Sequence, residues 1–377
     1  MPLRVPTTAV LALVLIPASL GQSQHPAQDL AKSSLPADPA PPAPTPAPAT
    51  DTALPHPAGS NAILPGAKPP SRTLFFFTSP RSTVEMVVHT IPATDAARLD
   101  RLRENFAAVD CGPDRMREQR IADGHGNTGA NLICIWPGST TGTIVVAAHY
   151  EHEGHGQGAL DDWSGAALLP FLYEAIQGQP RQNTYVFLES WKSKGAETWL
   201  KSLSKEDRKR IRAVIDLDGL GLSYTRFFTT FSPFETVPTG STHLQTQLLW
   251  AALSEGLTQA PEQVSPHHWL SVDPTDPFRA MMIPSIVIHS VPADQARIPG
   301  SSADIASAVN GNAYFTTYHL MCAFLASLDR VAVKLQTEDP IWDVSGNIDV
   351  EPEQETPVVT FRQFNHGRLV QTQSPPH

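Results

Sequence analysis

Three acidic residues and a histidine stand beside apolar segments in the middle of the chain. His149 directly follows the apolar run Thr143–Ala148, Asp161 and Asp162 precede an apolar helical stretch, and Asp218 follows another apolar run. In open α/β sheets, side chains that leave the carboxyl ends of buried strands form the sites. A histidine beside carboxylates at neighbouring strand ends suits a zinc ion. The spacing therefore predicts a metal site.

Each of these side chains also has a purely structural explanation. Asp162 or Ser164 can cap the helix that begins beside them, because side-chain oxygens accept hydrogen bonds from the first helical amides. An imidazole at a strand end, such as that of His149, can simply be hydrogen-bonded in place. Both explanations stay open at this level.

The elements that must position these residues alternate along the chain. Short apolar runs alternate with amphipathic stretches, which predicts an α/β fold with a mixed, mainly parallel central sheet and helices on both faces. The predicted strands are Asn131–Trp136, Thr143–Ala148, Asn183–Leu188, Ile211–Leu217 and Pro284–His289. The predicted helices are Ser164–Gln177, Ala196–Leu203, Thr242–Gly256 and Asn310–Asp329.

Two local patterns add to this scheme at the start of the folded region. The segment Thr83–Ile91 is rich in β-formers, and Thr94 can cap a helix with apolar residues along one side. The turn signal at 137–139 lies between Asn131–Trp136 and Thr143–Ala148, so these two strands are predicted to pair as a hairpin.

Composition divides the 377 residues into four parts. Residues 1–21 have the pattern of a cleavable signal peptide, and 22–70 are a Pro/Ala-rich linker that holds many of the 36 prolines. Residues 71–330 form the predicted α/β domain, and 331–377 are a polar C-terminal extension. We therefore expect a secreted or periplasmic protein.

The charge and the cysteines exclude several classes of protein. A net charge of −10 argues against a nucleic-acid partner, because a phosphate backbone needs a basic face. Three cysteines allow one disulfide at most, and no apolar run is long enough for a transmembrane segment. The segment 124–129 matches a dinucleotide fingerprint but precedes a strand instead of following one, so we interpret it as a flexible loop.

The residues around His149 resemble the co-catalytic zinc aminopeptidase family, which includes bacterial leucyl aminopeptidases and has glutaminyl cyclases as relatives. The resemblance covers roughly residues 130–329 and rests on the His149 strand and on the segments 158–165 and 215–221. It implies that His149, Asp161 and Asp218 bind zinc, with Asp161 as the residue that bridges two ions in the family. It also implies that Glu151 orients the His149 ring without binding the metal itself.

The chain departs from the family where the Glu-Glu pair is expected. One alignment places Glu189 and Ser190 there, and the other places Ser193 and Lys194. Under the first alignment Glu189 is the catalytic base, although it can equally be a solvated carboxylate at a strand end. Under neither alignment does the second carboxylate survive.

The last family ligand is also missing. The family has a histidine four residues before an aspartate that matches Asp304, and here that position is Gly300. The ligands implied for one zinc are therefore retained. The two ligands that bind only the other zinc in the family (its private ligands) are both lost. We expect one zinc per chain. Substitute ligands for the second ion remain an open alternative, from His152, Glu153 and His155 or from the pair at 267–268.

The resemblance implies an exported metallopeptidase that acts at free N-termini, on a peptide or a small amine. Zinc would activate water or a carbonyl, and Glu189 would accept the proton. The alternative is a catalytically inactive member that serves as a peptide-binding or scaffold module. A one-zinc acyltransferase like the glutaminyl cyclases is a weaker alternative. In those relatives the single zinc is bound by the glutamate and the late histidine, and both of these ligands are missing here. A serine hydrolase is weaker still, since no Gly-x-Ser-x-Gly segment occurs.

Overall fold

The protein is described here from a computed structural model. The structure describes residues 76–122, 128–152, 154–229, 238–264 and 275–337, together with two short strands at 362–365 and 368–371. The predicted signal peptide (1–21), the whole predicted linker (22–70) and most of the predicted extension (331–377) lie outside these residues. Glu153, the histidines at 267–268 and most of the 124–129 segment also lie outside them. Within the described ranges, no helix is both long enough and apolar enough to cross a membrane.

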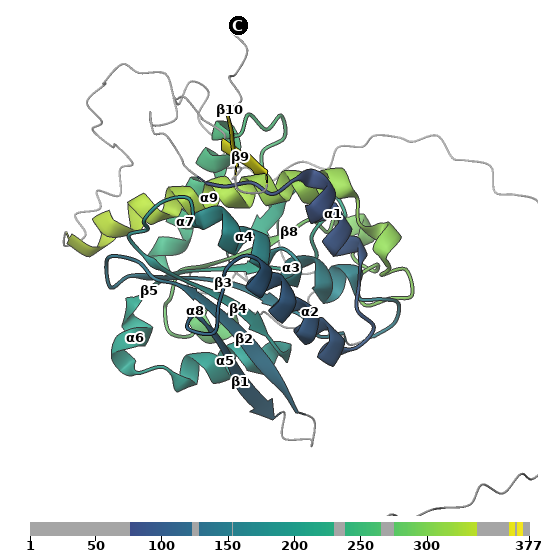
Figure 1. Cartoon of the computed structure of the whole chain (residues 1–377), viewed down its shortest axis with the longest axis horizontal. Coiled ribbons are helices and arrows are strands. Elements are labelled where there is room, and N and C mark those ends of the chain that lie inside the picture. Colours follow the sequence, from purple (N-terminus) through teal and green to yellow (C-terminus); the bar gives the residue numbers. More distant parts are fainter. Residues whose placement is uncertain are drawn as a thin grey trace, which may run out of the picture. The chain divides into compact units, whose positions relative to one another are not determined.

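One mixed sheet forms the centre of the domain (Figure 1). Its eight strands in the described residues are β1 (Met116–Ala122), β2 (Thr128–Trp136), β3 (Thr143–His149), β4 (Thr184–Ser190), β5 (Ile211–Leu217), β6 (Arg226–Phe228), β7 (Glu262–Gln263) and β8 (Ser285–His289). Their spatial order is β1-β2-β4-β3-β5-β8-β6-β7. The four central strands β4, β3, β5 and β8 are parallel, which confirms the mainly parallel sheet. Separately, β9 (Arg362–Asn365) and β10 (Arg368–Gln371) pair as an antiparallel hairpin.

Helices cover both faces of the sheet, as predicted. They are α1 (Arg81–His89), α2 (Asp95–Ala108), α3 (Ser164–Ala166), α4 (Leu169–Ile176), α5 (Lys192–Ser202), α6 (Lys205–Arg210), α7 (Thr239–Ser254), α8 (Asp276–Arg279) and α9 (Gly311–Thr337). The larger core cluster joins one face of the sheet to α1, α2, α4, α7 and α9. The smaller cluster joins the other face to α5 and α8 (Figure 1). Alternate residues of β3 therefore enter different cores, with Val146 in the larger and Val145 in the smaller.

All five predicted strands are present, as β2, β3, β4, β5 and β8, but the predicted hairpin is wrong. β2 pairs antiparallel with β1 and β4, whereas β3 lies between β4 and β5. The connection after β2 runs beside the segment that leads into β4, since Ser139 and Thr140 donate backbone hydrogen bonds to the carbonyls of Arg181 and Gln182. Because of this connection, β3 lies on the far side of β4 from β2, in the middle of the sheet. Both faces of β3 are buried there, one in each core cluster.

The β-rich segment Thr83–Ile91 is also a correction, because α1 occupies it. Val84 and Val88 are fully buried one helical turn apart, so a helix places both against the core, and this burial overrides their strand propensity. The helix predicted after Thr94 is confirmed as α2, whose Ala97 amide donates to the Thr94 hydroxyl. The predicted helix Ser164–Gln177 is divided into α3 and α4.

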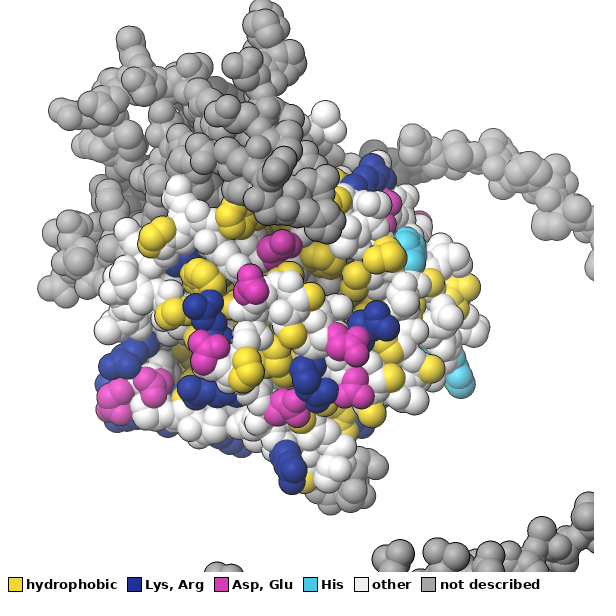
Figure 2. Space-filling model, in the orientation of Figure 1, with side chains coloured by type: hydrophobic (Ala, Val, Ile, Leu, Met, Phe, Trp, Pro, Cys, Tyr) yellow, Lys and Arg dark blue, Asp and Glu magenta, His cyan; other side chains and the backbone are white. Residues whose placement is uncertain are grey.

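The surface in Figure 2 carries both signs of charge. Lys and Arg side chains alternate with Asp and Glu side chains over this face and are interspersed with apolar groups. No continuous basic surface forms on the face shown.

A disulfide between Cys111 and Cys134 joins the end of α2 to β2 and closes a loop with a sequence separation of 23 residues. Cys322 is free and buried in α9. We expect the denatured, unreduced protein to release one thiol and the reduced protein three. Because the bridge restricts the unfolded chain, Cys134→Ser should lower the free energy of unfolding by about 3 kcal/mol. Thiol titration and urea unfolding measure the two quantities.

Cys322→Ala is the matched control, because it removes a buried thiol and leaves the bridge. It should lower stability by less than Cys134→Ser, and its unreduced form should release no thiol. Equal stability of Cys134→Ser and the wild type would contradict a structural role for the bridge.

Candidate metal centre

The carboxyl ends of β3 and β5 bring His149 and Asp218 to the same edge of the sheet. The two strands are adjacent and parallel, with Ala147 beside Asp216 in the register. Asp218 comes directly after β5, and its amide donates to the Ile288 carbonyl of β8 at 3.0 Å. The order of the strands thus brings the backbone of His149 and that of Asp218, which are distant in the sequence, to the same edge of the sheet.

Asp161 and Asp162 lie in a single π-helical turn, Ala159–Trp163, between β3 and α3. Asp161 has non-helical backbone angles, and the Asp161–Asp162 peptide bond is cis. The segment is held by the fully buried carboxylate of Asp304, which accepts hydrogen bonds from the amides of Leu160 at 2.7 Å and Asp161 at 3.2 Å. Asp304 therefore positions the backbone of the aspartate pair.

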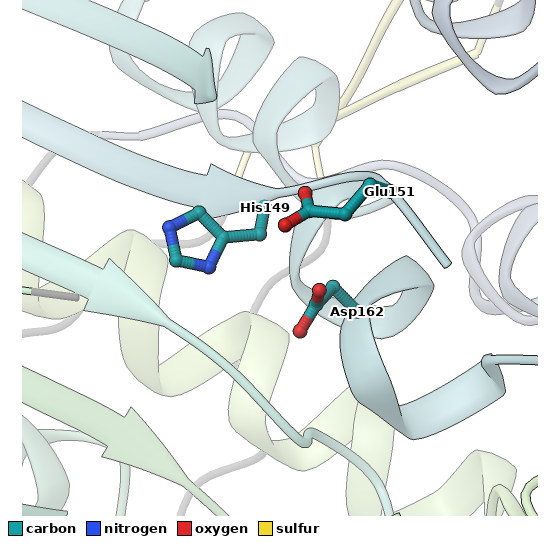
Figure 3. A group of neighbouring side chains, drawn as sticks. All are labelled: His149, Glu151 and Asp162. Atoms are coloured by element: carbon teal, nitrogen blue, oxygen red, sulfur yellow. The ribbon is translucent and has the colours of Figure 1, made fainter. Parts of the chain in front are cut away.

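Two groups of side chains lie close enough to share a cation. In the first, one ligand atom each of His149, Glu151 and Asp162 lie within 4.8 Å of one another, and Figure 3 shows the three side chains gathered at the end of the strand. In the second, the same holds for Asp161, Asp162 and Asp218. Asp162 belongs to both groups. An imidazole nitrogen with carboxylate oxygens is a donor set that zinc accepts.

Asp162 belongs to the acidic residues whose spacing predicts a metal site, but the family resemblance implies no ligand role for it. It had been interpreted as a possible helix cap, but neither it nor Ser164 caps a helix in this part of the structure. The Ser164 hydroxyl instead donates to the Leu160 carbonyl and accepts from the Leu220 amide. The Asp-Asp doublet before an apolar helix was the only signal available.

Several carboxylate oxygens near these strand ends are buried without a hydrogen-bond partner among the described residues. They include Asp216 Oδ2, Asp218 Oδ1 and both oxygens of Glu189. Buried polar atoms are normally paired, because leaving one unpaired costs about 1–3 kcal/mol. Unpaired acceptors beside a histidine are what a cation or ordered water would satisfy, so the residues fit a bound zinc ion.

The electrostatics of the metal-free site also favour a cation. Burial raises the pKa of Asp162 and Asp218 well above the usual range, and the neighbouring Asp161 raises each further. Burial lowers the pKa of His149 to about 4, although Asp161 opposes the shift. The imidazole is therefore neutral at neutral pH and has a free electron pair for a metal.

Glu189 and Ser190 end β4 beside β3. In the register Glu189 lies opposite Ala148, and Ser190 lies opposite His149. Both side chains are fully buried, and burial raises the pKa of Glu189 well above its ordinary value. The Ser190 hydroxyl has no partner among the described residues. Under the alignment that places Glu189 and Ser190 at the Glu-Glu pair, it stands in place of the second carboxylate.

Gly300 lies against the aspartate pair. Its amide donates to Asp304 Oδ2 at 3.0 Å, and a Cβ added to it would lie 3.1 Å from Asp161 Oδ2. Its φ of +68° is in the region that favours glycine. The chain therefore passes close to Asp161 at the place where the family carries a histidine, and it has no side chain there to bind a metal.

Of the proposed substitute ligands, the two that the structure describes, His152 and His155, do not extend the two groups. Among the described residues, His155 is exposed, and His152 has its Nδ1 buried beside Gly158. Neither belongs to a group that could hold a cation.

Comparison with known proteins identifies the family of this chain. The sequence model of peptidase family M28 matches residues 131–330, a range that contains all the residues of both groups and Gly300. A search of curated protein sequences gives no match.

Solved structures show the same fold at low sequence identity. The Macrostomum lignano glutaminyl cyclase matches with a TM-score of 0.55 and 16% identity over 66% of this chain and 89% of the cyclase. The LapA aminopeptidase of Legionella pneumophila matches with a TM-score of 0.53 and 16% identity over 66% of this chain and 70% of LapA. A zinc aminopeptidase from Bacillus subtilis matches with a TM-score of 0.47 and 16% identity over 54% of this chain. The chain spans about half the length of that enzyme, 51%.

Asp216 gives the metal-free protein a defined dependence of stability on pH. Burial raises its pKa from 3.8 to about 8, and Glu151 adds to the shift. The folded state therefore keeps a proton that the unfolded state loses near pH 4. This contribution to stability is complete below pH 4 and is lost as pH rises through about 8. Asp216→Asn stays neutral, so its urea midpoint in a chelator should fall less than that of the wild type from about pH 5 to about pH 9.

Asp114→Asn is the matched control, because the Asp114 side chain is 80% exposed. Its urea midpoints should follow those of the wild type at every pH. If the Asp216→Asn midpoints also run parallel to the wild type, Asp216 does not hold a proton in the folded state.

Proposed function

Since the chain belongs to peptidase family M28, we propose that it is a zinc-dependent hydrolase of peptide bonds at free N-termini and that it uses one metal ion. The observation that carries the proposal is the meeting of Asp161, Asp162 and Asp218 at the strand edge, with His149 joined to them through Asp162. The order of the strands builds this arrangement, and three of its members are the ligands that the family resemblance implies.

The proposed ligands are His149, Asp161 and Asp218, with Asp162 beside them. When bound, zinc supplies a Lewis acid that lowers the pKa of water or polarises a carbonyl. His149 is neutral and ready to bind because burial lowers its pKa to about 4. Glu151 is buried, and one of its carboxylate oxygens lies within 4.8 Å of a ring nitrogen of His149, a position that supports the proposed orienting role.

Glu189 is the proposed proton acceptor. Its side chain is fully buried one residue before the strand end, and neither oxygen has a partner among the described residues. Burial raises its pKa well above the ordinary value, and a carboxylate with a raised pKa holds an accepted proton more firmly than a solvated one. Glu189 would take the proton of the attacking water and deliver it to the new N-terminus.

A single metal ion is supported by the residue types at two positions. Ser190 and Gly300 stand where the family resemblance expects the private ligands of a second ion, and neither offers a carboxylate or an imidazole. The close approach of the Gly300 backbone to Asp161 also leaves little room for a side chain there. A two-metal mechanism relies on two ions about 3.5–4 Å apart, so the proposed reaction relies on one ion and Glu189.

The same two positions favour a second candidate function. A member that has lost half of its metal ligands can retain a peptide-binding edge without hydrolysing the peptide. In that case the protein would bind zinc and a peptide end, and it would show no turnover.

We further propose that the chain is exported through the signal peptide at 1–21. The Cys111–Cys134 disulfide supports this proposal, because such bridges persist mainly in oxidising compartments.

The test combines zinc content with activity on an aminoacyl anilide. We expect about one zinc ion per chain in the purified protein, lost in His149→Ala and in Asp218→Asn because each variant removes a ligand. Glu189→Gln should keep its zinc and lose kcat by about 10²–10⁴-fold, because general-base catalysis contributes that much. Elemental analysis and steady-state kinetics give the two readouts.

Glu197→Gln is the matched control, because Glu197 is an exposed carboxylate of α5 paired with Lys201. It should keep both zinc and activity. Zinc binding without turnover in the wild type would favour the second candidate, and a wild type that takes up no zinc would overturn both.

A further inference from the structure

The first turn of α2 lies against the loops of the metal centre, although it contributes no metal ligand. Arg98 of this turn is only 1% exposed. We propose that Arg98, assisted by Asp95, is a positioning residue that holds the loop between His149 and Asp161 in its metal-binding form. This inference rests on the proposed zinc site.

The Arg98 guanidinium is bonded entirely to backbone carbonyls. A guanidinium has five N–H donors, and all five are accounted for here. The acceptors are the carbonyls of Pro92 at 3.2 Å, Tyr150 at 3.0 Å, Glu151 at 3.1 Å, Gln157 at 2.6 Å and Gly158 at 3.4 Å.

Four of these carbonyls belong to the two ends of one loop. Tyr150 and Glu151 directly follow His149, and Gln157 and Gly158 directly precede the turn that carries Asp161 and Asp162. Arg98 therefore ties together the chain that leaves the histidine and the chain that enters the aspartate pair. A lysine in its place has a single nitrogen, which cannot reach all of these carbonyls.

Gly158 is the residue that permits this approach. Its φ is +56°, and an added Cβ would lie 2.9 Å from Arg98 Nη2 and 2.4 Å from His152 Nδ1. Any larger residue would push the loop away from the guanidinium. The close fit of the loop around Arg98 thus explains why residue 158, the first of the segment 158–165, is a glycine.

Asp95, in the same turn of α2, connects the loop after His149 to the segment after β4. Its Oδ1 accepts the His152 amide at 3.1 Å, and its Oδ2 accepts Trp191 Nε1 at 3.3 Å. Trp191 follows Ser190 at the end of β4. One turn of α2 therefore joins the segments that leave β3 and β4.

The charge of Arg98 is also suited to this place. Burial lowers its pKa, and the nearby carboxylates of Asp162, Asp95, Asp304 and Glu151 oppose that shift. The guanidinium also lies 5.8 Å from the centre of the Trp163 ring, next to Asp162 in the chain. A fixed positive charge reduces repulsion among these acids, and its donors, which all bond to carbonyls, leave the carboxylate oxygens free for the metal.

The experiment compares zinc affinity by chelator competition, the visible spectrum of bound Co²⁺, and amide hydrogen exchange of the metal-free full-length protein. In Arg98→Met we expect the zinc Kd to rise by about 10–100-fold, as for other residues that orient metal ligands. The Co²⁺ spectrum should change, and amides at 150–158 should exchange faster. Arg98→Lys should give an intermediate zinc Kd.

Arg103→Met is the matched control, because Arg103 lies on the same helix and pairs with Glu118 at the surface. It should change none of the three readouts. If Arg98→Met does not fold, Asp95→Ala serves instead, since Asp95 is not fully buried and its loss should also raise the zinc Kd and speed exchange at 150–158.

The outcomes separate this inference from the proposed function. A wild type that binds zinc, together with a folded Arg98→Met of unchanged zinc Kd and Co²⁺ spectrum, overturns the positioning role and leaves the zinc site intact. If Arg98→Met lowers the melting temperature but leaves the zinc Kd and the Co²⁺ spectrum unchanged, Arg98 only stabilises the fold, and the positioning role is again overturned. A wild type that binds neither zinc nor Co²⁺ overturns the proposed function and this inference with it.

Discussion

The burial of several carboxyl groups at one edge of the sheet is the constraint on which the rest of this site depends. Asp162 and Asp218 are almost fully buried, close to Asp161, and burial and mutual repulsion raise their pKa values. Carboxylates in such a place are costly unless they are protonated or paired with a cation. The fold keeps them there nonetheless, which is typical of sites that trade stability for function.

The framework around these acids is built from groups that do not compete for a metal. Asp304 bonds to the amides of Leu160, Asp161 and Gly300, and Arg98 bonds to carbonyls on both sides of the loop. Both residues bond to backbone groups, so neither of them occupies the carboxylates of Asp161, Asp162 and Asp218, whose ligand atoms lie within 4.8 Å of one another. Such support from outside the ligand set fixes the geometry of a metal site.

Membership in peptidase family M28 is consistent with the chemistry of His149, Asp161 and Asp218. The resemblance implies departures from the family at Ser190 and Gly300. The proposal of one ion rests on these assignments. At Gly300 the backbone passes close to Asp161, since φ is positive there and an added Cβ would lie 3.1 Å from Asp161 Oδ2.

Much of the fold and part of the site can be predicted from local patterns alone. Five strands, the helix after Thr94 and the positions of His149, Asp161 and Asp218 follow from apolar runs, a capping residue and a motif, because these signals are local in sequence. Three features could not be predicted in this way. They are the place of β3 between β4 and β5, the helical form of Thr83–Ile91, and the contact of Arg98 with the loop after His149. Each depends on which distant segment covers a given face, and that is decided only when the whole core packs together.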